Sequence, residues 1–203
     1  MKVMISSVFD WGGFMKRKLK IKYNSPVVIS FLVICLLVTL VGAFTNNEST
    51  VLYFSVYRNS LTNPMTYLRF LTHVFGHVGY DHFVGNAMYL LLLGPMLEEK
   101  YGSLFIFKVI FCTAFVTGIL HFVIFENISL CGASGIVFAF IVLASITQVK
   151  GNEIPLSFIL IVILFLGKEF IAGITVDDTI SNFAHVLGGI IGGIMGYLFN
   201  KKG

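Results

Sequence analysis

Long apolar stretches alternate with short polar segments along this chain. The clearest apolar stretch covers residues 26–44 and contains no charged residue. A transmembrane helix needs about 20 consecutive, mainly apolar residues. By this criterion the pattern predicts six membrane-spanning helices. They lie at residues 26–44, 82–97, 103–125, 132–149, 155–173 and 183–199.

The second stretch is the least regular of the six. It is short, and Gly85, Asn86 and Gly94 interrupt its apolar pattern. Residues 45–81 mix polar and scattered aromatic residues, so we expect a loop there. The sequence therefore predicts an all-α membrane protein, a bundle of six transmembrane helices. Its domain would cover residues 26–199, between a basic segment (1–25) and a short tail (200–203).

The composition argues for a membrane protein. Of the 203 residues, 57% are hydrophobic and only 12% are charged, whereas soluble domains have about 25% charged residues. The net charge of +4 does not indicate nucleic-acid binding, because the basic residues cluster at the ends of the apolar stretches. Cys35, Cys112 and Cys131 form no CxxC pair, so neither a disulfide framework nor a zinc site is indicated.

The distribution of Lys and Arg predicts the orientation of the chain. Six basic residues precede the first stretch, and in a six-span protein the two at the C-terminus lie on the same side, together with Lys100, Lys108 and Lys150. The opposite side receives only Arg58, Arg69 and Lys168. Because cytoplasmic segments have the excess of Lys and Arg, we expect both termini in the cytoplasm.

Three polar residues are expected at similar depth in the membrane. Asn86, Ser134 and His185 each lie near the start of a stretch that runs from the outer to the inner side. At about 1.5 Å per residue, each is roughly 3–8 Å below its helix end. Singly, each has an ordinary role open to it, since Ser bonds to its own helix backbone and Asn or His links helices or lies at the interface. Together they indicate an intramembrane site.

Small residues surround two of these polar residues. Gly132, Ala133 and Gly135 flank Ser134. The last stretch has two stripes of residues spaced by four, which are Ala184, Gly188, Gly192 and Gly196, and beside them His185, Gly189 and Gly193. Such stripes permit close approach of helices. If the fourth and sixth stretches pack together, Ser134 and His185 come within hydrogen-bond reach, as a nucleophile and its general base must.

Several short motifs occur together in one order along the chain. They are R-F-L-T-H at 69–73 after Leu68, H-F-V-G-N at 82–86 with His77 upstream, E-E-K-Y-G at 98–102, G-A-S-G at 132–135 and A-H-V-L-G at 184–188, followed by Gly192. In this order they resemble the motifs of the rhomboid intramembrane serine proteases. Leu68 stands where that family usually has tryptophan. Each motif alone is weak, and the ordered set is specific.

The resemblance implies a six-span rhomboid bundle and a serine endopeptidase with a Ser–His dyad. By that likeness Ser134 attacks the scissile carbonyl, and His185 takes up the proton and returns it to the leaving amine. The side chains of His82 and Asn86 would form an oxyanion hole with the Ser134 N–H. Phe138 replaces the tyrosine of many relatives, and we expect it to pack on His185. The supporting small residues would be Gly132, Gly135, Gly188 and Gly192.

The resemblance also implies partners and location. The substrates would be single-span or polytopic membrane proteins in the lipid bilayer, and no cofactor, metal ion or nucleic acid is expected. Residues 45–81 would form the membrane-embedded lateral loop of the family, and residues 155–173 and 174–182 would form the gate and lid. The compact form is similar to bacterial members, which implies the inner membrane with the site opening outward. The sequence specifies neither the substrate nor the oligomeric state.

Three alternatives remain open. A non-catalytic rhomboid-like protein would bind membrane clients, but such relatives usually lack the serine or the histidine. A transporter or channel would show internal repeats, and the sequence has none. His73 and His77, four residues apart and close to Asp81 and His82, raise the possibility of a metal site. However, Val74 stands where a metalloprotease has its glutamate.

Overall fold

The computed structural model describes residues 23–147, 153, 155–167 and 179–200. Within these ranges the chain is almost entirely helical, and pairing between extended segments is limited to isolated bridges such as that between Val56 and Leu130. The longer helices are α2 (Pro26–Phe44), α5 (Tyr80–Tyr101), α6 (Ser103–Ile124), α7 (Ser134–Ile146) and α10 (Thr179–Asn200). Between α7 and α10 lie the short helix α8 (Leu156–Ile161) and the π-helical segment η2 (Val162–Leu166).

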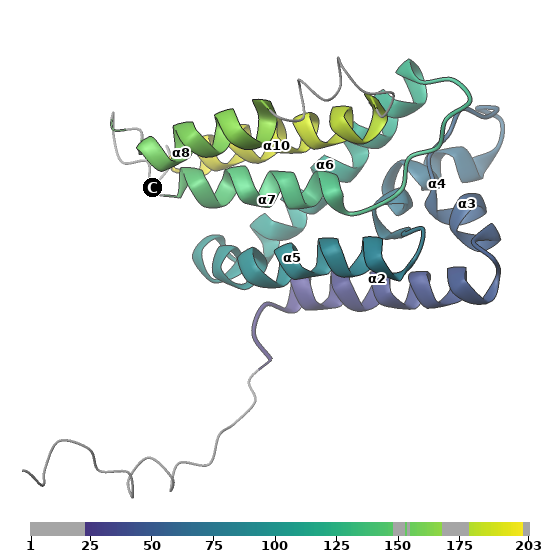
Figure 1. Ribbon diagram of the computed structural model, residues 1–203, viewed down its shortest axis with the longest axis horizontal. Helices are drawn as coiled ribbons and strands as arrows, with labels where there is room; N and C mark the ends of the chain where they lie inside the picture. The colour runs from purple at the N-terminus through teal and green to yellow at the C-terminus, as the bar shows by residue number, and fades with distance from the viewer. Residues whose placement is uncertain (1–22, 148–152, 154, 168–178, 201–203) are drawn as a thin grey trace, which may run out of the picture.

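α2, α5, α7, α8 and α10 run roughly along one axis, and α6 crosses behind them obliquely (Figure 1). α2 lies beside α5, and α7 lies beside α10. The short helices α3 (Glu48–Phe54) and α4 (Pro64–Thr72) gather at one end, opposite the C-terminus. Each of the six predicted stretches contains a helix. By length and composition α2, α6 and residues 182–200 of α10 are able to cross a membrane.

Residues 45–81 contain more structure than the expected loop. They hold α3, α4 and the 3-10 turn η1 (His73–Phe75). α4 begins at Pro64, whose fixed φ suits the first helical position. The Asn63 side chain accepts a hydrogen bond from the Met65 N–H at 3.0 Å and so caps the helix. Asn63 therefore acts as a helix cap, which hydropathy alone does not reveal.

The glycine-containing second stretch is also longer than predicted. α5 has 22 residues and continues through Gly85, Gly94 and Pro95. A Cβ on Gly94 would lie 2.6 Å from Val28 Cγ1 of α2. Gly94 therefore lets α2 pack against α5, and the apparent interruption is a helix contact. α7 has 13 residues, fewer than the predicted stretch at 132–149.

Parts of several predictions lie outside the described residues. These parts are residues 1–22 of the basic segment, Lys150, Lys168 with the end of the predicted gate, residues 174–178 of the predicted lid, and residues 201–203 of the tail.

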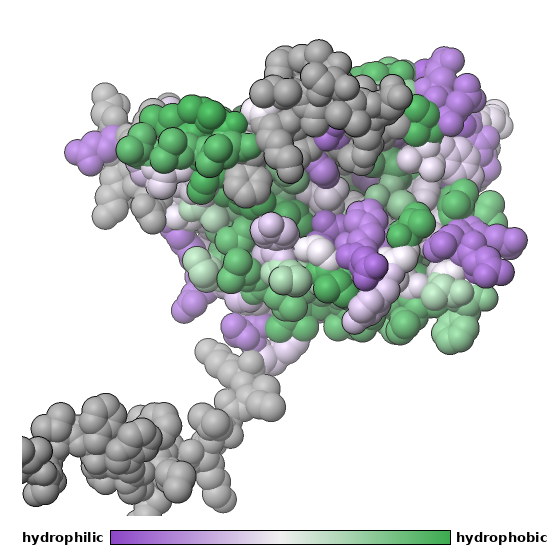
Figure 2. Space-filling model, in the orientation of Figure 1, coloured by the Kyte–Doolittle hydropathy of each residue, from purple (hydrophilic) through white to green (hydrophobic). Residues whose placement is uncertain are grey.

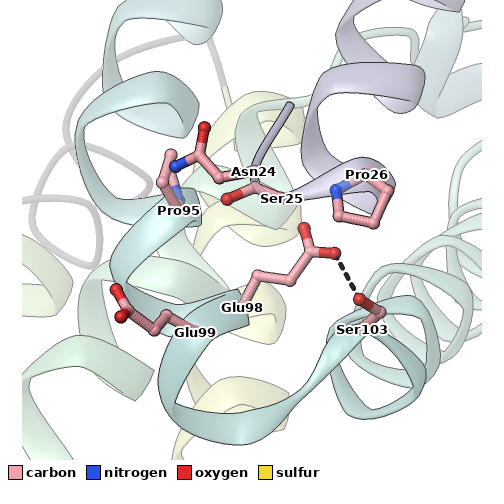
Figure 3. A pocket seen from close by; sticks show the side chains of 7 residues that line it. All are labelled: Asn24, Ser25, Pro26, Pro95, Glu98, Glu99 and Ser103. Atoms are coloured by element: carbon pink, nitrogen blue, oxygen red, sulfur yellow. Dashed lines mark hydrogen bonds between the residues drawn. The ribbon is translucent and has the colours of Figure 1, made fainter. Parts of the chain in front are cut away.

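A buried carboxylate joins three helices at the end opposite α3 and α4. Glu98 of α5 accepts hydrogen bonds from the Val27 and Val28 N–H groups, each at 3.0 Å. It also accepts one from the Ser103 hydroxyl at 2.7 Å (Figure 3). The first N–H groups of a helix have no partner within it, so Glu98 completes the start of α2 and fixes it to the α5–α6 junction.

The surface pattern fits a membrane protein. Figure 2 shows hydrophobic side chains over α8 and along much of the opposite edge, where α2 lies, with hydrophilic ones toward the two ends and near the start of α5. The core lies among α5, α6 and α7, where Leu90, Ile106, Ile136 and Phe140 are fully buried. Because many large apolar residues remain exposed on the flanks, lipid is the solvent that this surface suits.

Candidate active site

Ser134 is the first residue of α7 and is half-buried. The backbone just before it is tied to the segment after α4. The Gly132 N–H donates to the His73 carbonyl at 2.9 Å, and the Ala133 N–H donates to His77 Nε2 at 3.4 Å. Gly132 has φ +127°, which a residue with a side chain rarely adopts. The start of α7 is therefore positioned from outside its own helix.

The hydrogen bonds of His77 define its protonation. Because Nε2 accepts from the Ala133 N–H, the ring proton is on Nδ1, which donates to the Phe75 carbonyl at 3.2 Å. Burial, with a smaller contribution from the neighbouring His82 ring, lowers the pKa of His77 to about 4. The imidazole is therefore neutral near pH 7 and keeps its acceptor nitrogen.

His82 and Asn86 of α5 face the glycine that precedes Ser134. A Cβ on Gly132 would lie 3.0 Å from His82 Nε2 and 3.9 Å from Asn86 Nδ2. Asn86 is buried, and its Nδ2 has no hydrogen-bond partner among the described residues. A buried amide donor without a partner is uncommon and requires an explanation. Two side chains one helical turn apart thus present nitrogen atoms beside the start of α7.

α7 and α10 are in direct backbone contact. A Cβ on Gly188 would collide with the Gly135 carbonyl, and one on Gly192 would collide with the Ala139 carbonyl. In return, a Cβ on Gly135 would lie 3.3 Å from the Ala184 carbonyl. The small residues of both helices therefore fit into one another, so the helices that contain Ser134 and His185 touch along several turns.

His185 of α10 packs face to face on Phe138 of α7. The ring centroids are 4.3 Å apart and the planes differ by 8°. Phe138 follows Ser134 by one helical turn, so both lie on the same face of α7. The imidazole is therefore held against the face of α7 to which Ser134 belongs.

The expected residues thus come from three helices to one region. A hydroxyl (Ser134), an imidazole (His185) and two further nitrogen donors (His82, Asn86) surround the start of α7. Hydroxyl, imidazole and amide groups are the types from which a nucleophile, a base and donors for a developing negative charge are drawn. Within the described ranges no three His, Cys, Asp or Glu side chains gather as metal ligands, and His73 and His77 bond to backbone groups.

Two supporting contacts were not predicted from the sequence. His73 and His77 hold the two residues before Ser134, and Glu98 completes α2. The only sequence signal for the first was a pair of histidines in an otherwise mixed segment. The only sequence signal for the second was the E-x-x-x-G motif at 98–102, which does not indicate the groups that Glu98 binds.

The fold defines a helical membrane protein in which Ser134 and His185 lie on two helices that touch through small residues. A rhomboid domain model matches residues 64–202, about two-thirds of the chain. The chain therefore belongs to the rhomboid family, and it is an integral membrane protein.

Known relatives agree with this assignment. The chain is 32% identical to the rhomboid protease GluP of Bacillus subtilis over 75% of its own length, and 33% identical to rhomboid-related protein 1 of Caenorhabditis elegans over 64%. It is 25% identical to the rhomboid protease GlpG of Yersinia pestis over 85%. The matches span 29%, 39% and 62% of these relatives, so the chain corresponds to part of each.

Proposed function

We propose that this protein is an intramembrane serine endopeptidase with Ser134 as nucleophile and His185 as general base. The observation that carries the proposal is the stacking of His185 on Phe138, one helical turn from Ser134. A general base must be within hydrogen-bond reach of the hydroxyl that it activates. The names of two relatives, both rhomboid proteases, support the same activity.

In the proposed reaction the Ser134 Oγ attacks the scissile carbonyl while His185 takes the hydroxyl proton. His185 then returns this proton to the leaving amine, and an acyl-enzyme forms. Water, deprotonated by the same imidazole, releases the second product and regenerates the serine. No carboxylate is required as a third partner in this scheme.

The oxyanion of the tetrahedral intermediate would bind to His82, Asn86 and the backbone N–H of Ser134. The unpaired Nδ2 of Asn86 supports this assignment, because a buried donor without a partner is available to a ligand. The Ser134 N–H belongs to the first turn of α7, where helix N–H groups lack internal acceptors. Loss of one oxyanion donor typically costs about 3–4 kcal/mol in the transition state.

We further propose the six-span arrangement over residues 26–199, with both termini in the cytoplasm and the site opening outward. The alternating direction of the helices and the distribution of basic residues support it. The proposed location is the inner membrane of a bacterial cell, and the substrates are membrane proteins with a transmembrane segment. Reporter fusions after residues 62, 127 and 203 test the orientation: the first two should report the outer side and the third the cytoplasm.

The decisive experiment compares wild type with Ser134→Ala and His185→Ala. Purified protein in detergent is incubated with a membrane-anchored model substrate, and the products are separated by gel electrophoresis. We expect cleavage by wild type and none by either variant. Ser145→Ala serves as a matched control, since this buried hydroxyl on the same helix bonds to the Ile141 carbonyl.

A fluorophosphonate probe adds a second measurement. Labelling of wild type but not of Ser134→Ala would support an activated nucleophile. Absence of both cleavage and labelling in folded wild type would instead favour a non-catalytic protein that binds membrane clients.

A further inference from the structure

A groove lies between the start of α6 and the end of α10. Both segments are distant in sequence from the candidate catalytic serine. It has a volume of about 420 Å³, and Tyr101, the last residue of α5, closes one edge. Its other lining residues are Leu104, Phe105, Lys108, Met195, Leu198 and Phe199. We refer to these residues as the α6–α10 groove.

Three aromatic rings give this groove a rigid wall. Tyr101 stacks on Phe105 with centroids 5.0 Å apart, and Phe199 meets both rings edge-on at 4.9 and 4.7 Å. Each ring comes from a different helix, so the cluster holds the ends of α5, α6 and α10 together. Leu104, at 67% exposed, and Leu198 leave the groove open to the flank of the molecule. The shape and chemistry suit a hydrocarbon chain.

Lys108 gives this apolar groove its charge. It is exposed, is the only charged residue lining the groove, and makes no ion pair within the described ranges. The nearby Glu98 is already bound to the start of α2 and to Ser103. As the sixth residue of α6, Lys108 lies roughly 8 Å from the helix start. A lysine at that depth extends its ammonium toward the lipid headgroups.

We propose that the α6–α10 groove is a binding site for an anionic phospholipid. Its acyl chain would lie along the aromatic wall and Leu104, and its phosphate would bind the Lys108 ammonium. In the proposed orientation the groove lies in the cytoplasmic leaflet, where anionic lipids attract basic side chains. Lipid of any class fills an apolar groove, but the unpaired lysine selects a negatively charged headgroup. The site is independent of the proposed catalytic chemistry.

Tryptophan fluorescence can measure this selectivity, because Trp11 is the only tryptophan of the chain. In a Trp11→Phe background, Leu104→Trp places a reporter at the groove. Leu37→Trp places a control on the lipid-exposed face of α2, where Leu37 is 57% exposed. Both proteins are reconstituted in mixtures of brominated and unbrominated lipids, with phosphatidylglycerol or phosphatidylcholine as the quencher.

At the groove reporter we expect phosphatidylglycerol to bind about fivefold more tightly than phosphatidylcholine. This ratio corresponds to the attraction of about 1 kcal/mol that one lysine contributes. Lys108→Gln should reduce this preference to near one, and the control reporter should show none. Equal preference at both reporters, or a preference that survives Lys108→Gln, would overturn the proposal.

A second measurement avoids placing a tryptophan at the groove. Wild type and Lys108→Gln are purified in detergent and titrated with phosphatidylglycerol, and bound lipid is counted by native mass spectrometry. We expect one lipid to remain bound to wild type at several-fold lower concentration than to the variant. Identical titrations would contradict the site, whatever the proteolytic activity of the preparation.

Discussion

The Phe138 ring lies flat against the His185 imidazole, with 4.3 Å between centroids and 8° between planes. This contact joins α7 and α10 on the face to which Ser134 belongs. α10 has a glycine stripe where it meets α7, so the ring contact lies beside a close approach of the two backbones. The geometry of the proposed dyad therefore depends on an aromatic residue that performs no chemistry.

We expect Phe138→Ala to reduce catalytic efficiency by roughly 2–10-fold, because aromatic stacking contributes about 0.5–1.5 kcal/mol. Phe138→Tyr should retain near wild-type activity, since it keeps the ring. Initial cleavage rates of a membrane-anchored substrate provide the measurement. Equal rates for the alanine and tyrosine variants would show that the ring does not position the histidine.

The contact between α7 and α10 predicts different outcomes for two neighbouring glycines. Gly192→Ala would push a methyl group into the Ala139 carbonyl, so we expect a loss of stability of about 1–3 kcal/mol. Gly193→Ala is the matched control, because its Cβ would meet only Val142 Cγ1 at 3.4 Å. The Gly193→Ala variant should be as stable as wild type or more stable by up to about 1 kcal/mol. Thermal unfolding in detergent measures both, and similar losses would contradict the close approach at Gly192.

The two adjacent glutamates at the end of α5 should also differ in their contribution to stability. Glu98→Ala removes three hydrogen bonds and leaves the Val27 and Val28 N–H groups without partners, so we expect a loss of about 2–4 kcal/mol. Glu99 is exposed, and Glu99→Ala should change stability by less than about 0.5 kcal/mol. Unfolding of each variant is followed as the SDS concentration rises while the concentration of the lipid-like detergent is kept constant. The midpoints of these curves rank the stabilities of the variants. A result in which both lose equally would disprove the capping role.

The histidines near Ser134 predict a dependence of stability on pH. The pKa of His77 is about 4 in the folded protein and 6.5 when unperturbed, so between these values the unfolded state binds more protons. Stability should therefore fall as the pH drops from 6.5 toward 4, by about 3 kcal/mol for this group. His73, whose pKa burial also lowers to about 4, adds to the same trend.

His77→Gln tests the share of one histidine, since glutamine keeps an acceptor but does not titrate. Melting temperatures of wild type and variant are compared from pH 7 to 4.5, and the difference between them cancels the contribution of carboxylates common to both. We expect a shallower pH dependence in the variant. Parallel curves would mean that His77 does not lose its bond to the Ala133 N–H on protonation.

Much of the helical framework follows from the order of apolar and polar residues. The stretch 26–44 coincides with α2, and 103–125 coincides with α6 within one residue, because in lipid an apolar segment must satisfy its backbone within a helix. α4 was missed because its signals are the cap Asn63 and Pro64 rather than hydropathy. α3 was missed because it has only seven residues in a mixed segment. α5 extends beyond the predicted stretch at residues 80–81 and 98–101, because these mostly polar residues fall outside the apolar pattern. Gly94 lies inside the predicted stretch and serves as a contact with α2.

The candidate site, too, was predictable from the sequence only in part. The sequence by itself determined which residues have the chemistry, since a serine, a histidine and an asparagine among small residues are recognisable by type and spacing. Only the tertiary structure decided that the helices touch, that Phe138 stacks on His185, and that His73 and His77 hold Gly132 and Ala133. Spacing along a chain specifies the face of a helix, whereas contact between helices depends on packing among residues that are distant in sequence.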